Sequence, residues 1–390
     1  IREQERADPP RAEPLIPPEG MMMPGTVTLD FGEMQDGVMQ VEVELWNTDF
    51  VTSIERHGER VRLSVDTTVP IATLFARAEL VGRGHRGLTD VQGYESRIGL
   101  YLHEPYDSKK IPVVLVHGLR SSPATWREML NSFRADPVLR ERYQFWMFLY
   151  PSGLPVPRSA YYLRTALSEA RSLLAPDGPT ESMNQMVLVG HSMGGLISKA
   201  VLQDSGDELW DSLHPDRFED VEMPPVVREH LNEVFFYEAD QCVSRVVFIA
   251  TPHKGSSIAS SLVGRIGDSM VSLTDELNEV DRWFRAEQLN VDQDPTRQLH
   301  QGVPTSIDDL RPDSPHLVAY TKLPIRSGVQ YHSIAGNASG DSDGVVSVES
   351  ALLEGAESEL VVDAGHNVHE HPRAIREVRR ILLLHAESLD

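Results

Sequence analysis

The sequence predicts an α/β fold, in which a mostly parallel β-sheet carries helices on both faces. From Lys110 onward, short apolar runs alternate with amphipathic helical patterns. This alternation is typical of parallel strands that are joined by helical crossovers and buried on both faces. Because ligands of such sheets bind beyond the carboxyl ends of the strands, the residues that directly follow each apolar run are the candidates for a functional site.

Each predicted strand of this sheet is a short, mainly apolar run, as expected for a strand that is buried on both faces. These runs are IPVVLVHG, YQFWMFLYP, MVLVG, SRVVFIATP, VQYHSIAGN and ELVVDAGH. The predicted helices carry apolar residues at helical spacing. They are SPATWREMLNSFR, SAYYLRTALSEARSLL, MGGLISKAVLQD and PRAIREVRRILLLHAE. Together these elements predict one large domain over residues 105–390.

Residues 26–104 follow a different pattern. TVTLDFG, VMQVEVELW and RVRLSVD alternate apolar and polar residues with the period of a β-strand. PIATLFARAEL is expected to form a short helix with Pro70 at its start, and SRIGLYLHEPYD a further strand. We expect a small β-rich domain here, or an N-terminal β-rich extension of the main sheet. Residues 1–25 are expected to be a flexible tail, because six prolines and many charges lie in residues 1–24.

Two long insertions interrupt the α/β pattern, at about residues 204–243 and 255–328. The first is acidic and irregular. The second begins with apolar residues whose spacing puts them on one helix face, namely Ile258, Leu262, Ile266, Met270 and Leu273. Loops this long in a compact domain are usually functional or disordered. We interpret the second insertion as a cap or lid over the functional site, and the alternative is a helix that only packs on the core.

The composition limits the possible partners. A net charge of −23 repels nucleic acids and anionic membranes, so no nucleic-acid partner is expected. No run of 18 apolar residues occurs, so no stable membrane span is expected. The single cysteine, Cys242, excludes an intrachain disulfide and is expected to be a buried, inert thiol.

The compartment and the oligomeric state stay open. The sequence begins at Ile1 and its first residues are rich in proline, as in a tether between an export signal and a folded body. An exported, periplasmic or envelope-tethered bacterial protein is therefore one expectation. A cytoplasmic protein with a flexible tail is the other.

The strongest chemical signal is the segment MVLVGHSMGG, residues 186–195. It places the pattern G-x-S-x-G, centred on Ser192, between an apolar strand and a helix. A serine at such a sharp strand-to-helix turn exposes its hydroxyl above the sheet, and crowding in the turn favours glycine two residues before it and two after. We therefore predict that Ser192 is a nucleophile, and the alternative is a serine in a structural turn.

A nucleophilic serine needs a base and an acid that orients the base, and in this type of sheet the acid precedes the histidine along the chain. Asp341 and Asp343 follow the strand VQYHSIAGN. We favour Asp343, which begins a turn through Gly344 toward the next element, because Asp341 lies in a more flexible glycine-serine loop. The alternative is that both are ordinary turn aspartates.

The candidate base is His366, which directly follows the strand ELVV. His371 precedes Pro372, where the last helix should begin, so we expect it to lie at the helix cap. The cluster of His366, His369 and His371 around Glu370 leaves a metal-dependent hydrolase as an alternative. Since the order of serine, aspartate and histidine explains His366 without a metal, we expect no metal and no cofactor.

Two backbone amides are candidates for stabilising an oxyanion. The loop HGLR, residues 117–120, follows the strand PVVLV, and a turn of this type aims an amide across the nucleophile pocket. We assign that amide to Leu119. The second is the amide of Met193, at the N-terminus of the helix after Ser192. His117 is expected to hold this loop in place.

The segments VVLVHGL, VLVGHSMGG, SDGVV and DAGH resemble those of the α/β-hydrolase superfamily, in particular its lipase- and esterase-like serine hydrolases. The resemblance covers about residues 110–390 apart from the two insertions, and FIATPHKGS is similar to a segment of bacterial lipases that leads into the lid. It implies an acyl-enzyme route on carboxylic esters. In that route Ser192 attacks the carbonyl carbon, His366 takes its proton and later activates water, and Asp343 orients His366.

The resemblance also implies that the amides of Leu119 and Met193 hold the oxyanion, and that the partner is a small-molecule or lipid ester. We therefore expect a carboxylic ester hydrolase, an esterase or lipase. The alternatives are an acyltransferase or thioesterase on the same triad, a metal-dependent hydrolase, or a non-catalytic binding protein. Residues 26–104 match no part of the family pattern, and neither fold nor triad selects the substrate.

Overall fold

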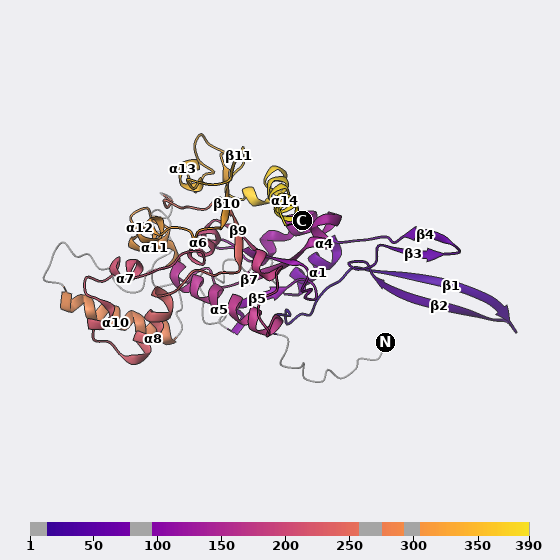
Figure 1. The fold of residues 1–390 in the computed structure, drawn as a ribbon, viewed down its shortest axis with the longest axis horizontal. Helices are drawn as coiled ribbons and strands as arrows, with labels where there is room; N and C mark the ends of the chain where they lie inside the picture. Colours follow the sequence, from indigo (N-terminus) through magenta and orange to yellow (C-terminus); the bar gives the residue numbers. More distant parts are fainter. Residues whose placement is uncertain (1–13, 79–95, 257–274, 292–304, 390) are drawn as a thin grey trace.

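The computed structural model describes residues 14–78, 96–256, 275–291 and 305–389 (Figure 1). Its centre is a seven-stranded sheet in the order β11-β10-β9-β8-β6-β7-β5. The strands are β5 (Gly99–Leu102), β6 (Ile111–Val116), β7 (Tyr143–Leu149), β8 (Met186–His191), β9 (Val243–Ile249), β10 (Gln330–Gly336) and β11 (Ser358–Val362). All pairings among them are parallel except that of the edge strand β5 with β7. The predicted α/β class is thus confirmed.

Both faces of this sheet are buried, because successive residues of a strand point to opposite sides. In β6, Val114 and Val116 belong to one apolar core, and Val113 and Leu115 belong to the other. The helices on the first face are α5 (Val156–Leu174) and α6 (Met193–Ala200). Those on the second are α1 (Thr68–Arg77), α3 (Arg127–Ala135), α4 (Pro137–Arg142) and α14 (Pro372–Glu387). This double cover explains why the strands read as continuous apolar runs.

Short helices connect these elements. They are η3 (Pro123–Trp126), η4 (Met183–Gln185), α7 (Glu208–Asp211), η5 (Phe218–Asp220), α11 (Ser306–Asp309), α12 (Pro315–Lys322), α13 (Val348–Ala351) and η7 (Val368–Glu370). Within the part of the chain that is described, no helix has the length and apolar character needed to cross a bilayer. Cys242 is a buried free thiol, as predicted, and burial raises the pKa of that thiol.

The first insertion is more regular than the sequence suggested. It contains the helix α8 (Pro225–Phe235), which the acidic sequence did not suggest. The buried Val227, Leu231 and Val234 of α8 follow helical spacing. α8 packs against α10 (Asp275–Val291) of the second insertion, at the end of the molecule away from the N-terminal hairpins (Figure 1). The predicted apolar stripe over residues 258–273 lies outside the described residues, so its role as a lid stays a prediction.

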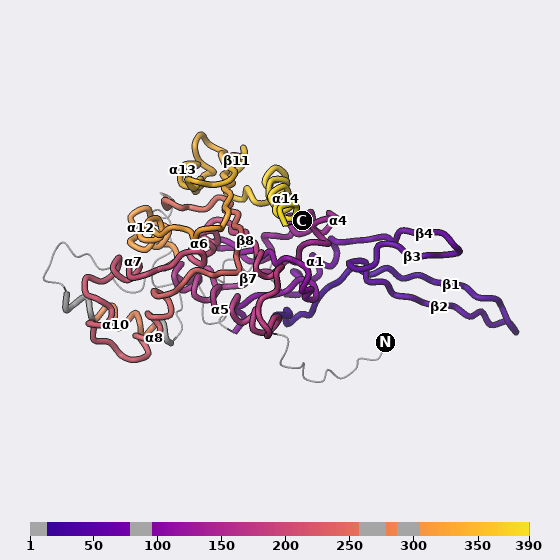
Figure 2. Tube along the Cα trace, viewed as in Figure 1, coloured from indigo at the N-terminus to yellow at the C-terminus, as the bar shows by residue number. Residues whose placement is uncertain are grey.

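Residues 25–62 form two hairpins that project from the body (Figure 1). β1 (Gly25–Gln35) pairs with β2 (Val38–Asn47), and β3 (Ser53–Arg56) pairs with β4 (Glu59–Arg62), both in antiparallel register. Figure 2 shows the chain running out and back along each hairpin before it enters the body. The predicted β-rich extension is therefore present, although its last strand, β5, belongs to the main sheet.

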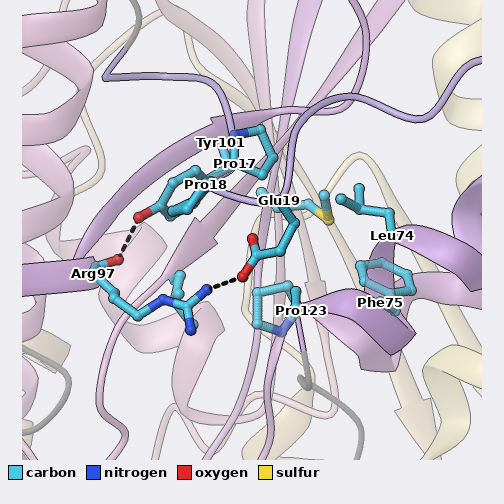
Figure 3. Close-up of a pocket in the computed structure, with 11 residues that line it drawn as sticks. Pro17, Pro18, Glu19, Leu74, Phe75, Arg97, Tyr101 and Pro123 are labelled. Atoms are coloured by element: carbon cyan, nitrogen blue, oxygen red, sulfur yellow. Dashed lines mark hydrogen bonds and ion pairs between the residues drawn. The ribbon is translucent and has the colours of Figure 1, made fainter. Parts of the chain in front are cut away.

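Residues 14–24 differ from the expected flexible tail, because they pack on the body. Leu15 is buried, and its carbonyl accepts a hydrogen bond of 2.8 Å from the amide of Leu102. Figure 3 shows Glu19 paired with Arg97, at 2.7 Å, beside the two prolines that precede it. Proline limits the freedom of the unfolded chain, so this segment loses little entropy when it is fixed along the sheet edge.

Candidate active site

Ser192 lies in a strained turn between β8 and α6. Its backbone has φ 54° and ψ −125°, a region that residues with a side chain rarely adopt. The amide of Ser192 donates to the carbonyl of Ile249 in the neighbouring strand β9 at 2.8 Å, which holds the turn against the sheet. A Cβ atom at Gly190 would lie 2.6 Å from the carbonyl oxygen of Gly194, so the glycine predicted at this position is required by the close approach of the two backbones.

Three side chains that are far apart in sequence form one hydrogen-bonded line. The Oγ atom of Ser192 lies 2.9 Å from Nε2 of His366, and Nδ1 of His366 lies 2.8 Å from Oδ2 of Asp343. Because a carboxylate can only accept, the proton of the neutral ring lies on Nδ1, and Nε2 is free to accept the serine proton. The structure thus brings together the three residues that the sequence singled out.

The Asp343 carboxylate is fixed by its own loop. Its Oδ1 atom accepts hydrogen bonds from the amides of Val345 (2.8 Å) and Val346 (2.7 Å). Its side chain is 1% exposed, against 22% for that of His366, so the imidazole reaches solvent while the carboxylate does not. The alternative acid, Asp341, lies in the same loop at φ 66° and is exposed.

His191 contacts the loop that carries His366, a feature that the sequence did not predict. Its Nε2–H donates to the backbone carbonyl of His366 at 2.9 Å. Burial, together with the nearby His369 and His366, holds the pKa of His191 well below its usual value, so the ring is neutral. The sequence signal was the position of this histidine directly before Ser192, which puts it at the carboxyl end of β8.

His369 packs against His191 and so supports the contact of His191 with the His366 loop. Its ring packs against that of His191, with 3.9 Å between centroids, and meets the edge of Trp126. Its Nε2 lies 2.5 Å from Oγ1 of Thr125. Burial lowers the pKa of His369 to about 3, with smaller effects of His366 and Arg127. A neutral His191 ring therefore packs beside the His366 ring, with 5.1 Å between centroids.

The three histidines of the C-terminal cluster bind separate partners. His371 caps α14 as predicted, since its side chain accepts from the amide of Arg373 at 3.2 Å. His366 faces Ser192 and Asp343, and His369 faces Thr125, so the three rings do not converge on one point. Among the described residues, no group of three or more His, Cys, Asp or Glu side chains is arranged to hold a metal ion.

The loop after β6 lies directly against the nucleophile. A Cβ atom at Gly118 would lie 2.9 Å from Cβ of Ser192, so only glycine allows this approach. The His117 ring stacks on Tyr150 (4.3 Å between centroids), and the Tyr150 hydroxyl donates to the His117 carbonyl at 2.6 Å. Burial lowers the pKa of His117 to about 4. These contacts fit the prediction that His117 holds the loop.

Leu119 follows Gly118 in this loop, and Met193 directly follows Ser192 at the start of α6. In the described part of the chain, neither amide donates a hydrogen bond to a protein group. Arg120, the next loop residue, has φ 56°, and its amide donates to Oγ of Ser152 at 3.0 Å. This hydrogen bond fixes the loop next to Leu119.

A small recess lies beside the start of α5, which follows β7 at the carboxyl edge of the sheet. Its walls are mainly apolar and come from α5, α8, α10 and α12, with Arg158, His230 and His316 among them. Burial lowers the pKa of His230 to about 3, with a smaller effect of Arg158.

The chain belongs to the alpha/beta hydrolase family, whose model matches residues 113–378. The match spans the sheet from β6 to β11 and the residues of the hydrogen-bonded line. A search of curated proteins finds no match.

The solved structures to which the chain is similar include lipases and esterases. The mature form of a Bacillus licheniformis lipase is 18% identical, with a TM-score of 0.43, and the match covers 73% of this chain and 97% of that one. A lipase-esterase related protein from Clostridium acetobutylicum is 12% identical (TM-score 0.37; 73% and 98% covered). An esterase from Exiguobacterium antarcticum is 15% identical (TM-score 0.35; 74% and 95% covered).

Proposed function

We propose that this protein hydrolyses carboxylic esters through an acyl-enzyme intermediate. Ser192 Oγ attacks the carbonyl carbon while His366 Nε2 takes the hydroxyl proton. The Asp343 carboxylate stabilises the imidazolium that forms. The proton then passes from His366 to the leaving alcohol, and a water molecule activated by His366 releases the acid in the second half of the cycle.

The tetrahedral intermediate carries a negative oxygen, and we assign its stabilisation to the amides of Leu119 and Met193. The close approach of the neighbouring Gly118 to Ser192 and the lack of protein acceptors for the two amides among the described residues support this role. Donors that are fixed before the reaction act without further reorganisation. The single observation that carries the proposal is the hydrogen-bonded line from Ser192 through His366 to Asp343, at 2.9 Å and 2.8 Å. Ser192 itself is held in a strained turn.

We further propose a preference for esters with an apolar acyl chain, which the apolar stripe in the sequence over residues 258–273 favours. A series of esters that share one alcohol group and differ in acyl chain length measures this preference. We expect kcat/KM to rise beyond the acetyl ester. Activity confined to acetyl esters would refute an apolar acyl site, but it would leave the proposed chemistry intact.

The chemistry itself is tested with wild type and two serine variants in the same assay. Ser192→Ala should lower kcat by on the order of 10⁶-fold, since removal of such a nucleophile leaves little catalysis. Ser172→Ala, at an exposed position of α5, serves as the matched control and should hydrolyse like wild type. A Ser192→Ala protein with undiminished activity, or wild-type activity that a metal chelator abolishes, would contradict the proposal.

A further inference from the structure

We infer that the exposed apolar face of the β1–β2 hairpin binds a second copy of this chain. The cross-strand pairs on this face are Val27/Leu45, Leu29/Val43, Phe31/Val41 and Met34/Met39. Residues directly opposite in an antiparallel pair point to the same side, so all eight side chains share one face. Each of them is between 42% and 76% exposed. We name these eight residues the arm face.

The arm face is maintained by a register shift. Alternation along β1 puts Val27, Leu29 and Phe31 on one side, and simple continuation would turn Met34 to the other side. The register of β1 against β2 shifts between Phe31 and Met34. A β-bulge of this kind reverses the alternation, so Met34 returns to the arm face opposite Met39. The apolar row therefore continues to the tip.

The other face of the hairpin is polar and already has a partner within the chain. Arg56 of β3 is paired with Asp30 and with Glu44 (2.5 Å), and its guanidinium donates to Oγ1 of Thr28 at 2.9 Å. These contacts hold the β3–β4 hairpin on the polar face. Among the described residues, the arm face has no comparable cover, and the hairpin points away from the body (Figure 1).

The area of the arm face fits a dimer interface. Eight side chains of this size and exposure present on the order of 600 Å² of apolar surface, whereas monomers rarely expose patches of more than a few hundred Å². Two such faces packed together would bury about 1,200 Å², which is the lower end of the range for specific interfaces. A lone two-stranded ribbon is marginally stable in water, and a second ribbon packed on its apolar face supplies the missing layer.

Charge favours a second copy over a lipid surface as the occupant. The arm face contains no charged residue, so two copies can meet there by a two-fold axis without opposing like charges. The tip carries Glu33 and Asp36, and a charged tip opposes insertion of the hairpin into a bilayer. The net charge of −23 also opposes binding to anionic lipids.

The test measures the mass of the full chain by sedimentation equilibrium over a range of concentrations. Wild type should be a dimer, and Leu29→Glu with Val43→Glu should weaken association by on the order of 10²-fold or more, because two charges from each chain would be buried in the interface. Val38→Glu is the matched control, since Val38 lies on the polar side of the same hairpin and is 67% exposed; it should stay dimeric. Leu29→Thr with Val43→Thr keeps the β-propensity of the strands and should also weaken the dimer.

Two results would overturn the inference: a wild-type monomer at all concentrations, and a dimer that the arm-face variants leave unchanged. If that monomer also floats with zwitterionic vesicles, the arm face binds lipid and not a second copy. Higher salt should strengthen the dimer, because it screens the repulsion between two acidic chains and leaves apolar contact in place. Ester hydrolysis should be the same in all of these variants, so failure here and failure of the proposed function are separate outcomes.

Discussion

Two aspartate–histidine pairs with the same contact and a buried carboxylate lie in different parts of this molecule. Asp343 and His366 meet at 2.8 Å beneath Ser192, and Asp309 and His316 meet at 2.8 Å within the second insertion. Each pair joins a carboxylate oxygen to Nδ1 of the ring. The side chain of His366 is 22% exposed and its Nε2 reaches Ser192, whereas that of His316 is 3% exposed. Nε2 of His316 has no hydrogen-bond partner among the described residues.

The two pairs also differ in what the second carboxylate oxygen binds. In Asp343 it binds amides of its own loop, so the carboxylate is fixed for one imidazole that faces a nucleophile. In Asp309 it accepts from the amide of Val156 at 2.7 Å, which ties the insertion to the first turn of α5. An aspartate–histidine pair thus orients a ring wherever it occurs. We propose a chemical role only for the pair at the carboxyl end of a strand beside a serine, and a structural role for the other.

The largest expected difference between the two pairs is in activity. Asp343→Asn should lower kcat by about 10⁴-fold, because an amide in place of the carboxylate favours the wrong tautomer of His366. Asp309→Asn should change kcat by only a few-fold. Steady-state ester hydrolysis with both variants measures this. Equal losses in the two proteins would remove the distinction.

His191 offers a smaller, indirect effect on the first pair. His191→Phe keeps a ring against His369 but removes the donor to the His366 carbonyl, so the imidazole is held less firmly. We expect kcat to fall by about 10 to 100-fold with little change in KM, since small displacements of a catalytic group have effects of this size. His191→Asn restores a donor and should recover part of the loss. An unchanged kcat in His191→Phe would show that this hydrogen bond does not position His366.

The structural role of the second pair predicts an effect on stability. Asp309→Asn should lower the free energy of unfolding by about 1.5–3 kcal/mol, the usual contribution of a hydrogen bond to a charged group. Urea denaturation measures the loss. The exposed Asp177→Asn is the control and should stay within about 0.5 kcal/mol of wild type. If Asp309→Asn unfolds like this control, the pair does not tie the insertion to α5.

The buried histidines near the site also predict that stability depends on pH. The pKa of His117 is lowered from 6.5 to about 4 and that of His369 to about 3, in both cases mainly by burial. Between pH 6.5 and these values the unfolded chain binds protons that the folded chain excludes. The free energy of unfolding should therefore fall as pH falls through this window, by up to about 1.4 kcal/mol per pH unit for each ring.

His369→Gln isolates this contribution, because it keeps a polar partner for Thr125 and does not titrate. The difference in the free energy of unfolding between wild type and this variant should shift in favour of the variant as pH falls from 6.5 toward 4. A difference that is constant over this range would contradict the assignment. Loss of hydrolysis at low pH is a separate effect, since protonated His366 cannot act as a base.

The sequence was most informative about the candidate site, whose residues lie in short segments. Ser192, Asp343 and His366 each follow an apolar run, and parallel strands bring their carboxyl ends to one edge of the sheet. The order of the three residues could therefore be predicted without knowing any distance. The role of His191 could not, because its contact with the His366 carbonyl exists only once β8 and the loop after β11 are adjacent in the sheet.

The insertions and the hairpins show the limits of pattern analysis. The Asp309–His316 pair is local in sequence, but its bond to the Val156 amide depends on how the insertion packs on α5. Helix α8 was not predicted because charged residues on its solvent side interrupt the apolar pattern in the sequence. For β1 and β2 the alternation predicted two faces correctly, but a period of two cannot tell whether an apolar face meets a core, a partner or solvent.

The most direct test of the central claim is to identify the residue that a serine-directed fluorophosphonate modifies. The protein is treated with the reagent, ester hydrolysis is followed in parallel, and the modified peptide is located by mass spectrometry. We predict one adduct, on Ser192, that appears at the rate at which activity is lost and is absent from Ser192→Ala. Full loss of activity with the adduct on another residue, or an unmodified Ser192 in an inactivated protein, would contradict the account.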